Sequence, residues 1–409
     1  MGAQGRVWAI EPASQTAHYL AMSIQSNGFS QTALLRMALS DHVGSAWLGV
    51  QSNSELNAIV SDGKQTGTGE LVRLQTLDAL ATEEGVNNLD FVKLDAEGEE
   101  IRIVAGGSSF FANENPLVMF ELKHGSEINV GLIEAFSQAG YNIYRLMPGA
   151  QLLVPCDPAS PLDPYQLNLF ACKPERARQL EQEGVLVTSG DTKKAAPCPE
   201  VDLQHILGAM AWSSEFDGVS YSSPSLLALA VRSYLSAQDT TYSPESRQLA
   251  LARALELAFQ ATSQREDVWH LATLARIAAA VGNRATAVHA LGRAIDLAMQ
   301  NNVPAPHEPF LPPTPEFDRI APDGRGPIWL LSALADGFVR QRSFSTYFAD
   351  RDALQNLEAL RSTGFQRISM ERARQLMRIR AGLQAGPTAD PRLSHSSAEH
   401  RNSRFWGGA

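Results

Sequence analysis

Short β-rich segments alternate with amphipathic helical segments in the N-terminal part of the chain, and this alternation restricts the fold more than any other feature. Four segments are typical of buried strands: residues 7–11, 33–38, 91–95 and 116–121. Between the first two, residues 14–27 carry apolar side chains at helical spacing, with Ser14 as the predicted N-cap and Gly28 just past the end. Strands joined through helices run parallel, so the sequence predicts an α/β sheet covered on both faces.

Later segments continue this α/β pattern. Residues 96–105 are predicted to form a helix that Gly106 and Gly107 stop, and residues 128–136 a helix that ends before Gly140. Residues 141–146 and 167–171 then read as two strands that pair in a closing hairpin. The predicted domain therefore ends close to residue 173.

Helical periodicity dominates the remainder of the chain, and part of it repeats. Residues 250–260 and 290–300 are nearly the same sequence at an offset of 40 residues. The segment between and around them resembles a tetratricopeptide unit, with Ala and Leu in place of the usual glycine and large aromatics. The repeat predicts antiparallel helix pairs over residues 226–302, with five side chains buried between them: Leu251, Leu255, Leu274, Leu291 and Ile295.

Changes in composition divide the chain into six predicted parts. These are the α/β domain (1–173), a polar linker with the first helices (174–225), the helical repeats (226–302), a Pro-rich connector (303–327), C-terminal helices (328–384) and a flexible tail (385–409). The connector contains eight of the 22 prolines. Proline cannot donate a helical hydrogen bond, so this segment is expected to be a stiff, partly extended link.

Composition also limits the class of protein. The chain of 409 residues has 34 Lys and Arg against 44 Asp and Glu, a net charge of −10 that argues against nucleic acid as the main partner. Its three cysteines lack the close spacing of zinc or redox motifs. No apolar run approaches the roughly 18 residues of a transmembrane span. We therefore expect a cytoplasmic protein without a transmembrane segment.

Acidic residues follow three of the predicted strands. Glu11 ends the first, Asp41 follows the second and Asp95 ends the third. One acid at such a place is more often a helix N-cap or a solvated loop end. Because ligands of open α/β sheets bind beyond the carboxyl ends of the strands, three acids in register favour a nucleoside site.

The same region resembles the FkbM family of S-adenosylmethionine-dependent methyltransferases over about residues 5–172. The resemblance is carried by six motifs in order: residues 9–12 (AIEP), 27–29 (NGF), 38–41 (ALSD) with Gly44, 76–78 (TLD), 93–100 (KLDAEGEE) with Gly106, and 120–121 (FE). Residues 93–100 are the most specific of these. The order and spacing of all six make a chance match improbable.

The resemblance implies methyl transfer from S-adenosylmethionine to a hydroxyl of a sugar, glycan or polyketide-like acceptor. By the family's motifs, Glu11 would hold the ribose, Ser40 and Asp41 would lie on the adenine side, and Asp95 and Glu97 would lie beside the methionine end and the acceptor. Three residues are candidates for a base that accepts the hydroxyl proton: Glu97, Glu121 and His124. His124 could equally be a surface histidine beyond its strand. No metal ligands are assigned.

One departure from the family leaves two hypotheses. Only ten residues precede Glu11, so the first strand and the glycine-rich turn of a Rossmann-like nucleotide site are missing from the sequence. The main hypothesis is an N-terminally shortened methyltransferase fused to a helical region that selects the acceptor or binds a protein partner. The alternative is an inactive remnant that serves as a helical-repeat interaction protein.

A last feature is a basic segment near the C-terminus. Five arginines lie between residues 367 and 380, accompanied by Glu371. Such a helix could dock on an acidic partner or a membrane surface. A solvated helix face is the more common explanation.

Overall fold

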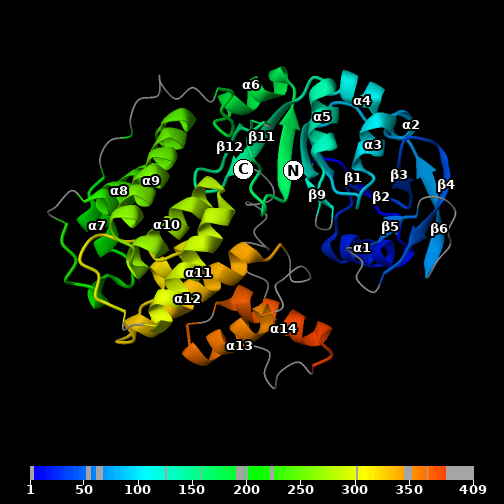
Figure 1. The fold of residues 1–409 in the computed structure, drawn as a ribbon. Helices are drawn as coiled ribbons and strands as arrows, with labels where there is room; N and C mark the ends of the chain where they lie inside the picture. The colour runs from blue at the N-terminus through cyan, green and yellow to red at the C-terminus, as the bar shows by residue number, and fades with distance from the viewer. Residues whose placement is uncertain are drawn as a thin grey trace. The chain divides into compact units, whose positions relative to one another are not determined.

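The computed structural model describes residues 4–51, 57–60, 68–124, 127–157, 159–189, 198, 201–221, 225–300, 303–344, 352–365 and 367–383. These residues form two compact units (Figure 1). The sheet unit contains the described residues up to Ile143 together with Asn168–Arg176. The helical unit contains Tyr144–Leu167 and the described residues from Ala177 onward. The chain therefore combines mixed sheets in its N-terminal part with a helical C-terminal region.

The predicted βαβ unit is present at the start of the sheet unit. It consists of β1 (Val7–Ile10), α1 (Ser14–Asn27) and β2 (Thr32–Leu35), and the two strands run parallel. Gly28 ends α1 with φ +66°, as predicted, because a glycine adopts this left-handed conformation without strain. Ser14 is not the N-cap: it is the first helical residue, and the carboxylate of Glu70 accepts its backbone N–H at 2.7 Å.

A second sheet follows that the sequence did not reveal. It contains β3 (Ala38–Leu39), β4 (Gly44–Gly49), β5 (Ala58–Ile59) and β6 (Gly69–Gln75), in the order β3-β6-β4-β5. Only β3 and β6 are parallel, and the other pairs are antiparallel. The predicted strand at residues 33–38 is therefore divided between β2 and β3, which belong to different sheets.

The third sheet contains the remaining long strands. These are β7 (Phe91–Leu94), β8 (Leu117–Glu121), β11 (Asn142–Met147), β12 (Leu152–Pro155) and β13 (Asn168–Cys172), in the order β12-β11-β13-β8-β7. β7 and β8 are parallel, and β13 is antiparallel to β8. β11 lies beside β13 as predicted. However, the strand that forms an antiparallel hairpin with β11 is β12, the next strand along the chain. Two short antiparallel strands, β9 (Lys123–His124) and β10 (Glu127–Ile128), follow β8.

Short helices connect these strands, and one of them begins later than predicted. They are α2 (Leu77–Glu84), α3 (Glu100–Gly106), α4 (Ser108–Asn113), α5 (Val130–Gln138) and α6 (Pro174–Gln182). The expected helix at residues 96–105 starts only at Glu100. Glu97 and Gly98 have φ of +47° and +100°, which a right-handed helix cannot contain. The segment after Asp95 is therefore a tight loop.

The helical unit is a succession of helices in which each of the long ones packs on the next (Figure 1). They are α7 (Leu203–Gly208), α8 (Leu226–Ser236), α9 (Pro244–Gln264), α10 (Val268–Val281), α11 (Arg284–Gln300), α12 (Gly326–Arg342), α13 (Ala353–Thr363) and α14 (Ile368–Arg380). Of the five side chains expected at the seams, Leu251, Leu274 and Leu291 are buried and the other two are partly buried. Among the described helices, none has the length and apolar character needed to cross a membrane.

The Pro-rich segment between α11 and α12 is part of the core, although its composition suggested a link. Phe310 is fully buried, with its ring centroid 4.5 Å from that of Trp212 and 4.4 Å from that of Trp269. Leu311 is fully buried as well, and so is Phe317 in the short 3-10 helix η5 (Pro315–Arg319). Proline prevents this segment from being helical, but it does not prevent burial of the apolar side chains between the prolines.

One face of α10 binds the backbone of this segment. The indole of Trp269 donates to the carbonyl of Pro304 at 2.8 Å, and Thr273 accepts the backbone N–H of Leu311 at 3.0 Å. Arg276 donates to the carbonyl of Pro312 at 3.0 Å and forms an ion pair with Asp318 at 2.7 Å. An extended segment cannot satisfy its own carbonyls, and these side chains supply the missing donors.

Arg367, Arg374 and Arg378, at the start of α14 and within it, have internal partners, which neither interpretation of the sequence anticipated. Arg374 is 1% exposed and pairs with Glu371 at 2.6 Å and Glu358 at 3.0 Å. Hydrogen bonds from Arg374 lower the pKa of Glu371 to about 2. Arg367 pairs with Asp336 of α12 at 2.6 Å. These ion pairs join α12, α13 and α14 and make this face structural.

Ala294→Leu is expected to destabilise the helical unit by about 1–3 kcal/mol, because Ala294 is fully buried in the core around α10 and α11 and a larger side chain would overpack it. Ala252→Leu is the matched control, since Ala252 is exposed on α9. Chemical denaturation followed by circular dichroism measures both. Equal stability of the two variants would show that the core around Ala294 has room for a leucine.

Candidate functional site

A cavity of about 300 Å³ lies where β1, β3 and β7 end. Its acidic lining consists of Glu11, Asp95, Glu97 and Glu99, and its apolar walls include Leu39, Leu48, Ile59 and Ile103. β1 and β7 belong to different sheets, and within the described residues each pairs with one strand only. The cavity therefore brings together two of the strand ends, those of Glu11 and Asp95, that the sequence identified.

Glu11 is half-buried just after β1. One of its carboxylate oxygens accepts the backbone N–H of Ala13 at 2.8 Å, which fixes the side chain at the turn into α1. Burial raises the pKa of Glu11, the Ala13 hydrogen bond opposes this, and the nearby Glu70 raises it further. Within the described part of the chain no group donates to the second carboxylate oxygen of Glu11, so this oxygen can accept a hydroxyl of a ligand in the cavity.

Ser40 and Asp41 follow β3 and are not among the cavity-lining residues. Ser40 is 1% exposed, and its hydroxyl donates to Glu99 at 2.9 Å. Asp41 is exposed and lies 2.6 Å from the imidazole Nδ1 of His42, a hydrogen bond that lowers the pKa of Asp41. Ser40 thus connects the end of β3 to the loop before α3, while Asp41 faces solvent beside the cavity.

The acids in the run after β7 differ in their roles, and Glu99 and Glu100 both have partners that hold the loop in place. Glu100 is buried, and its carboxylate accepts the backbone N–H groups of Ala96 at 2.9 Å and Gly98 at 3.1 Å. Glu99 is also buried and pairs with Arg102 at 3.5 Å in addition to Ser40. These two acids fix the loop between Asp95 and α3, and this loop presents Glu97 toward the cavity.

Gly106 of α3 is required by close packing against the end of β3. A Cβ atom at this position would come too close to the carbonyl oxygen of Ser40 and would lie 3.1 Å from Cα of Asp41. The helix can therefore approach the strand end only with glycine at this position. This contact explains why one of the six sequence motifs includes Gly106.

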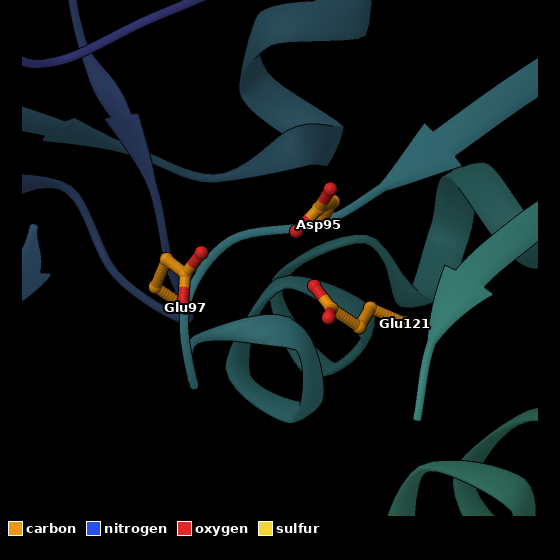
Figure 2. Close-up of side chains that lie close together, drawn as sticks. All are labelled: Asp95, Glu97 and Glu121. Atoms are coloured by element: carbon orange, nitrogen blue, oxygen red, sulfur yellow. The ribbon is translucent and has the colours of Figure 1, made fainter. Parts of the chain in front are cut away.

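Three carboxyl groups converge at the ends of β7 and β8 (Figure 2). Asp95 follows β7, Glu121 is the last residue of β8, and Glu97 comes from the loop before α3. One carboxyl oxygen from each of the three side chains lies within 4.8 Å of the other two. Lys93, one strand position before Leu94, places its Nζ 2.6 Å from Oδ2 of Asp95.

The protonation of this cluster is unequal. Burial raises the pKa of Glu121 to about 9, with further contributions from its hydrogen bond to Asp95 and from the charges of Asp95, Glu97 and Glu100. Burial also acts on Asp95, but hydrogen bonds from Glu121 and Lys93 outweigh it and lower the pKa of Asp95. The pKa values of Asp95 and Glu121 are therefore shifted in opposite directions.

His124 completes the predicted site residues. Its backbone belongs to β9 and pairs with Glu127, and its side chain lies outside what the structure describes. Sequence reasoning missed Lys93, although its position two residues before Asp95 places both side chains on the same face of the strand. It also missed the apolar wall from β4 and β5, since these strands were not recognised.

Comparison with known proteins gives one family. Residues 1–143 match the model of the methyltransferase FkbM domain. No curated protein and no solved structure matches the chain significantly. The match confirms the resemblance that the six motifs indicated, and it covers the N-terminal part of the chain.

Proposed function

We propose that the chain is an S-adenosylmethionine-dependent O-methyltransferase that acts on a hydroxyl of a sugar, glycan or polyketide-like acceptor. The observation that carries this proposal is the single cavity shared by Glu11 and Asp95 within a domain that matches a methyltransferase family. The carboxyl ends of two strands meet at this cavity, and ligands of open α/β sheets bind beyond such strand ends.

The lining of the cavity suits this cofactor. A volume of about 300 Å³ is at the lower end of the range for small-molecule sites. Glu11 would accept the ribose hydroxyls, the apolar walls around Leu39 and Ile103 would contact the adenine, and Asp95 would face the cationic methionine end. Ser40 and Asp41 would act from the rim on the adenine side. The cofactor supplies an activated methyl group when bound.

We also propose that the sheets correspond to a Rossmann-like methyltransferase sheet that lacks its first strand. Two of the observed sheets fit such a sheet when they are placed side by side, in the order β2-β1 and then β7-β8-β13-β11. The parallel pairs β1-β2 and β7-β8 and the antiparallel strand β13 then occupy the expected positions. The missing position is the one between β1 and β7, where both strands present an unpaired edge among the described residues. The carboxyl ends of these two strands line the cavity.

The chain's own contribution to the chemistry is alignment and proton transfer. A methyl group on a sulfonium is already electrophilic, so the acceptor oxygen must be held in line with it. Glu97 lies in the cavity lining and within the carboxyl cluster, a position suited to accept the hydroxyl proton. His124 stays a second candidate for this role. We propose that the helical unit selects the acceptor or binds a protein partner, and that catalysis occurs in the sheet unit.

Glu11→Ala is expected to weaken binding of S-adenosylmethionine at least fivefold, because unpaired ribose hydroxyls cost about 1–3 kcal/mol. We expect the full chain itself to bind weakly, with a dissociation constant from the high-micromolar to the millimolar range, or about −4 to −5.5 kcal/mol. The open edge of β7 leaves that side of the cavity without the backbone donors of a neighbouring strand. Saturation-transfer NMR with S-adenosylmethionine measures affinities in this range.

Glu134→Ala is the control for this experiment, because Glu134 is exposed on α5 and does not line the cavity. Its affinity should equal that of the unaltered chain. Absence of saturation transfer at millimolar S-adenosylmethionine would contradict the proposed function. That result would favour the alternative, an inactive methyltransferase remnant whose helical unit serves as an interaction scaffold.

A further inference from the structure

The carboxyl groups of Asp95 and Glu121 lie close together at the ends of two neighbouring strands, and their oxygens lie within 4.8 Å of each other and of those of Glu97. Two ionised carboxylates repel each other at this distance and have no proton with which to form a hydrogen bond. A single proton held between Asp95 and Glu121 removes this repulsion and supplies the hydrogen bond.

The surroundings decide which of the two carries it. Lys93 contacts Oδ2 of Asp95 at 2.6 Å and stabilises the anion there. Glu121 faces the negative charges of Asp95, Glu97 and Glu100 instead, and each of them favours its neutral form. From this asymmetry we infer that Asp95 and Glu121 hold one shared proton on Glu121, which makes Glu121 a neutral positioning residue for the Asp95 carboxylate.

This inference adds to the proposed function, and the role that it gives Glu121 toward the cofactor rests on that function. A carboxyl group that already holds a proton cannot accept one from an acceptor hydroxyl. Glu121 therefore leaves the set of candidate bases, while Glu97 and His124 stay in it. The O–H of Glu121 and the ammonium of Lys93 together fix the Asp95 carboxylate from two sides. Asp95 is thereby oriented at the edge of the cavity, where the cationic end of the cofactor would lie.

The shared proton can be observed directly in the full chain. Glutamate labelled with ¹³C at Cδ is followed by NMR from pH 4 to 10 in buffer containing EDTA. One carboxyl resonance should titrate near pH 9, and it should be missing from the spectrum of Glu121→Gln. In the control Glu134→Gln, which removes an exposed acid of α5 away from the cavity, the alkaline titration should persist. If every glutamate titrates below pH 6, or if the alkaline titration survives in Glu121→Gln, the inference is wrong.

The positioning role is tested by cofactor affinity. A glutamine amide donates a hydrogen bond to Asp95 as the neutral carboxyl does, so Glu121→Gln should bind S-adenosylmethionine within about threefold of the unaltered chain. Glu121→Ala removes the donor and should lose at least tenfold. Equal losses in the two variants, with circular dichroism unchanged, would overturn the positioning role. If the alkaline titration is observed but no variant binds S-adenosylmethionine, the inference of a shared proton stands and the proposed function is refuted.

Discussion

Phe310→Ala is expected to destabilise the helical unit by about 3–5 kcal/mol, the range for truncating a buried aromatic side chain. Phe310 is fully buried between Trp212 and Trp269, with Phe216 at a centroid distance of 5.5 Å. Truncation would leave a cavity among rigid rings that cannot collapse to fill it. Urea denaturation followed by tryptophan fluorescence measures both the loss of stability and the change in the environment of the indoles.

The control for this prediction is Phe259→Ala in the same unit. Phe259 is 41% exposed on α9, so its truncation removes little buried area and should change the stability by less than about 1 kcal/mol. If Phe310→Ala were as mild as Phe259→Ala, the Pro-rich segment would be a detachable link, as its composition alone suggests.

Gly106→Ala is expected to cost about 3 kcal/mol or more, at the upper end of the range for overpacking. The added Cβ would collide with the carbonyl oxygen of Ser40, and a backbone atom on a strand end cannot move aside as a flexible side chain can. α3 would have to shift away from β3, which also displaces Ile103 from the cavity wall. The measurements are thermal unfolding and S-adenosylmethionine binding, and both should decrease.

Gly208→Ala controls for the general effect of removing a glycine from a helix. A Cβ at Gly208, the last residue of α7, would have nothing within 4 Å. This substitution should leave the stability unchanged or raise it by up to about 1 kcal/mol, because alanine loses less backbone entropy on folding. A loss of stability in Gly208→Ala equal to that in Gly106→Ala would contradict the close-packing explanation.

Local signals predicted the βαβ unit well and the second sheet not at all. α1 shows clear helical periodicity and a terminal glycine, and both ends were placed within one residue. In β6, Leu71 is 69% exposed while Val72 and Leu74 are buried, so the apolar residues of the sequence do not alternate as the burial does. β3 and β5 have two residues each, too few to leave a periodic signal.

At the site, the sequence predicted which residues lie together but not how their roles divide. Asp95 and Glu121 end neighbouring parallel strands, so their proximity follows from the order of strands. The roles of Glu97, Glu99 and Glu100 depend on the left-handed backbone at Glu97 and Gly98, which turns one acid outward and two inward. Four acids in a run of six residues give no local signal that distinguishes them.

The burial of the Pro-rich segment was not predicted, because proline content reports on backbone conformation and not on burial. Phe310, Leu311 and Phe317 were the available signal, since three large apolar side chains are unusual in a solvated link. The polar stripe of α10 that binds this segment was not recognisable. Trp269, Thr273 and Arg276 acquire their partners only when residues more than thirty positions away fold onto them.

The open edges of β1 and β7 bear on how the chain behaves at high concentration. Each edge presents backbone N–H and C=O groups that have no strand partner among the described residues, and Phe91 at the start of β7 is 47% exposed. Edges of this kind add strands from neighbouring molecules and promote self-association. The net charge of −10 opposes aggregation only through long-range repulsion, which salt screens. We expect these two edges to lower the solubility of the purified chain, and the solubility should fall as ionic strength rises.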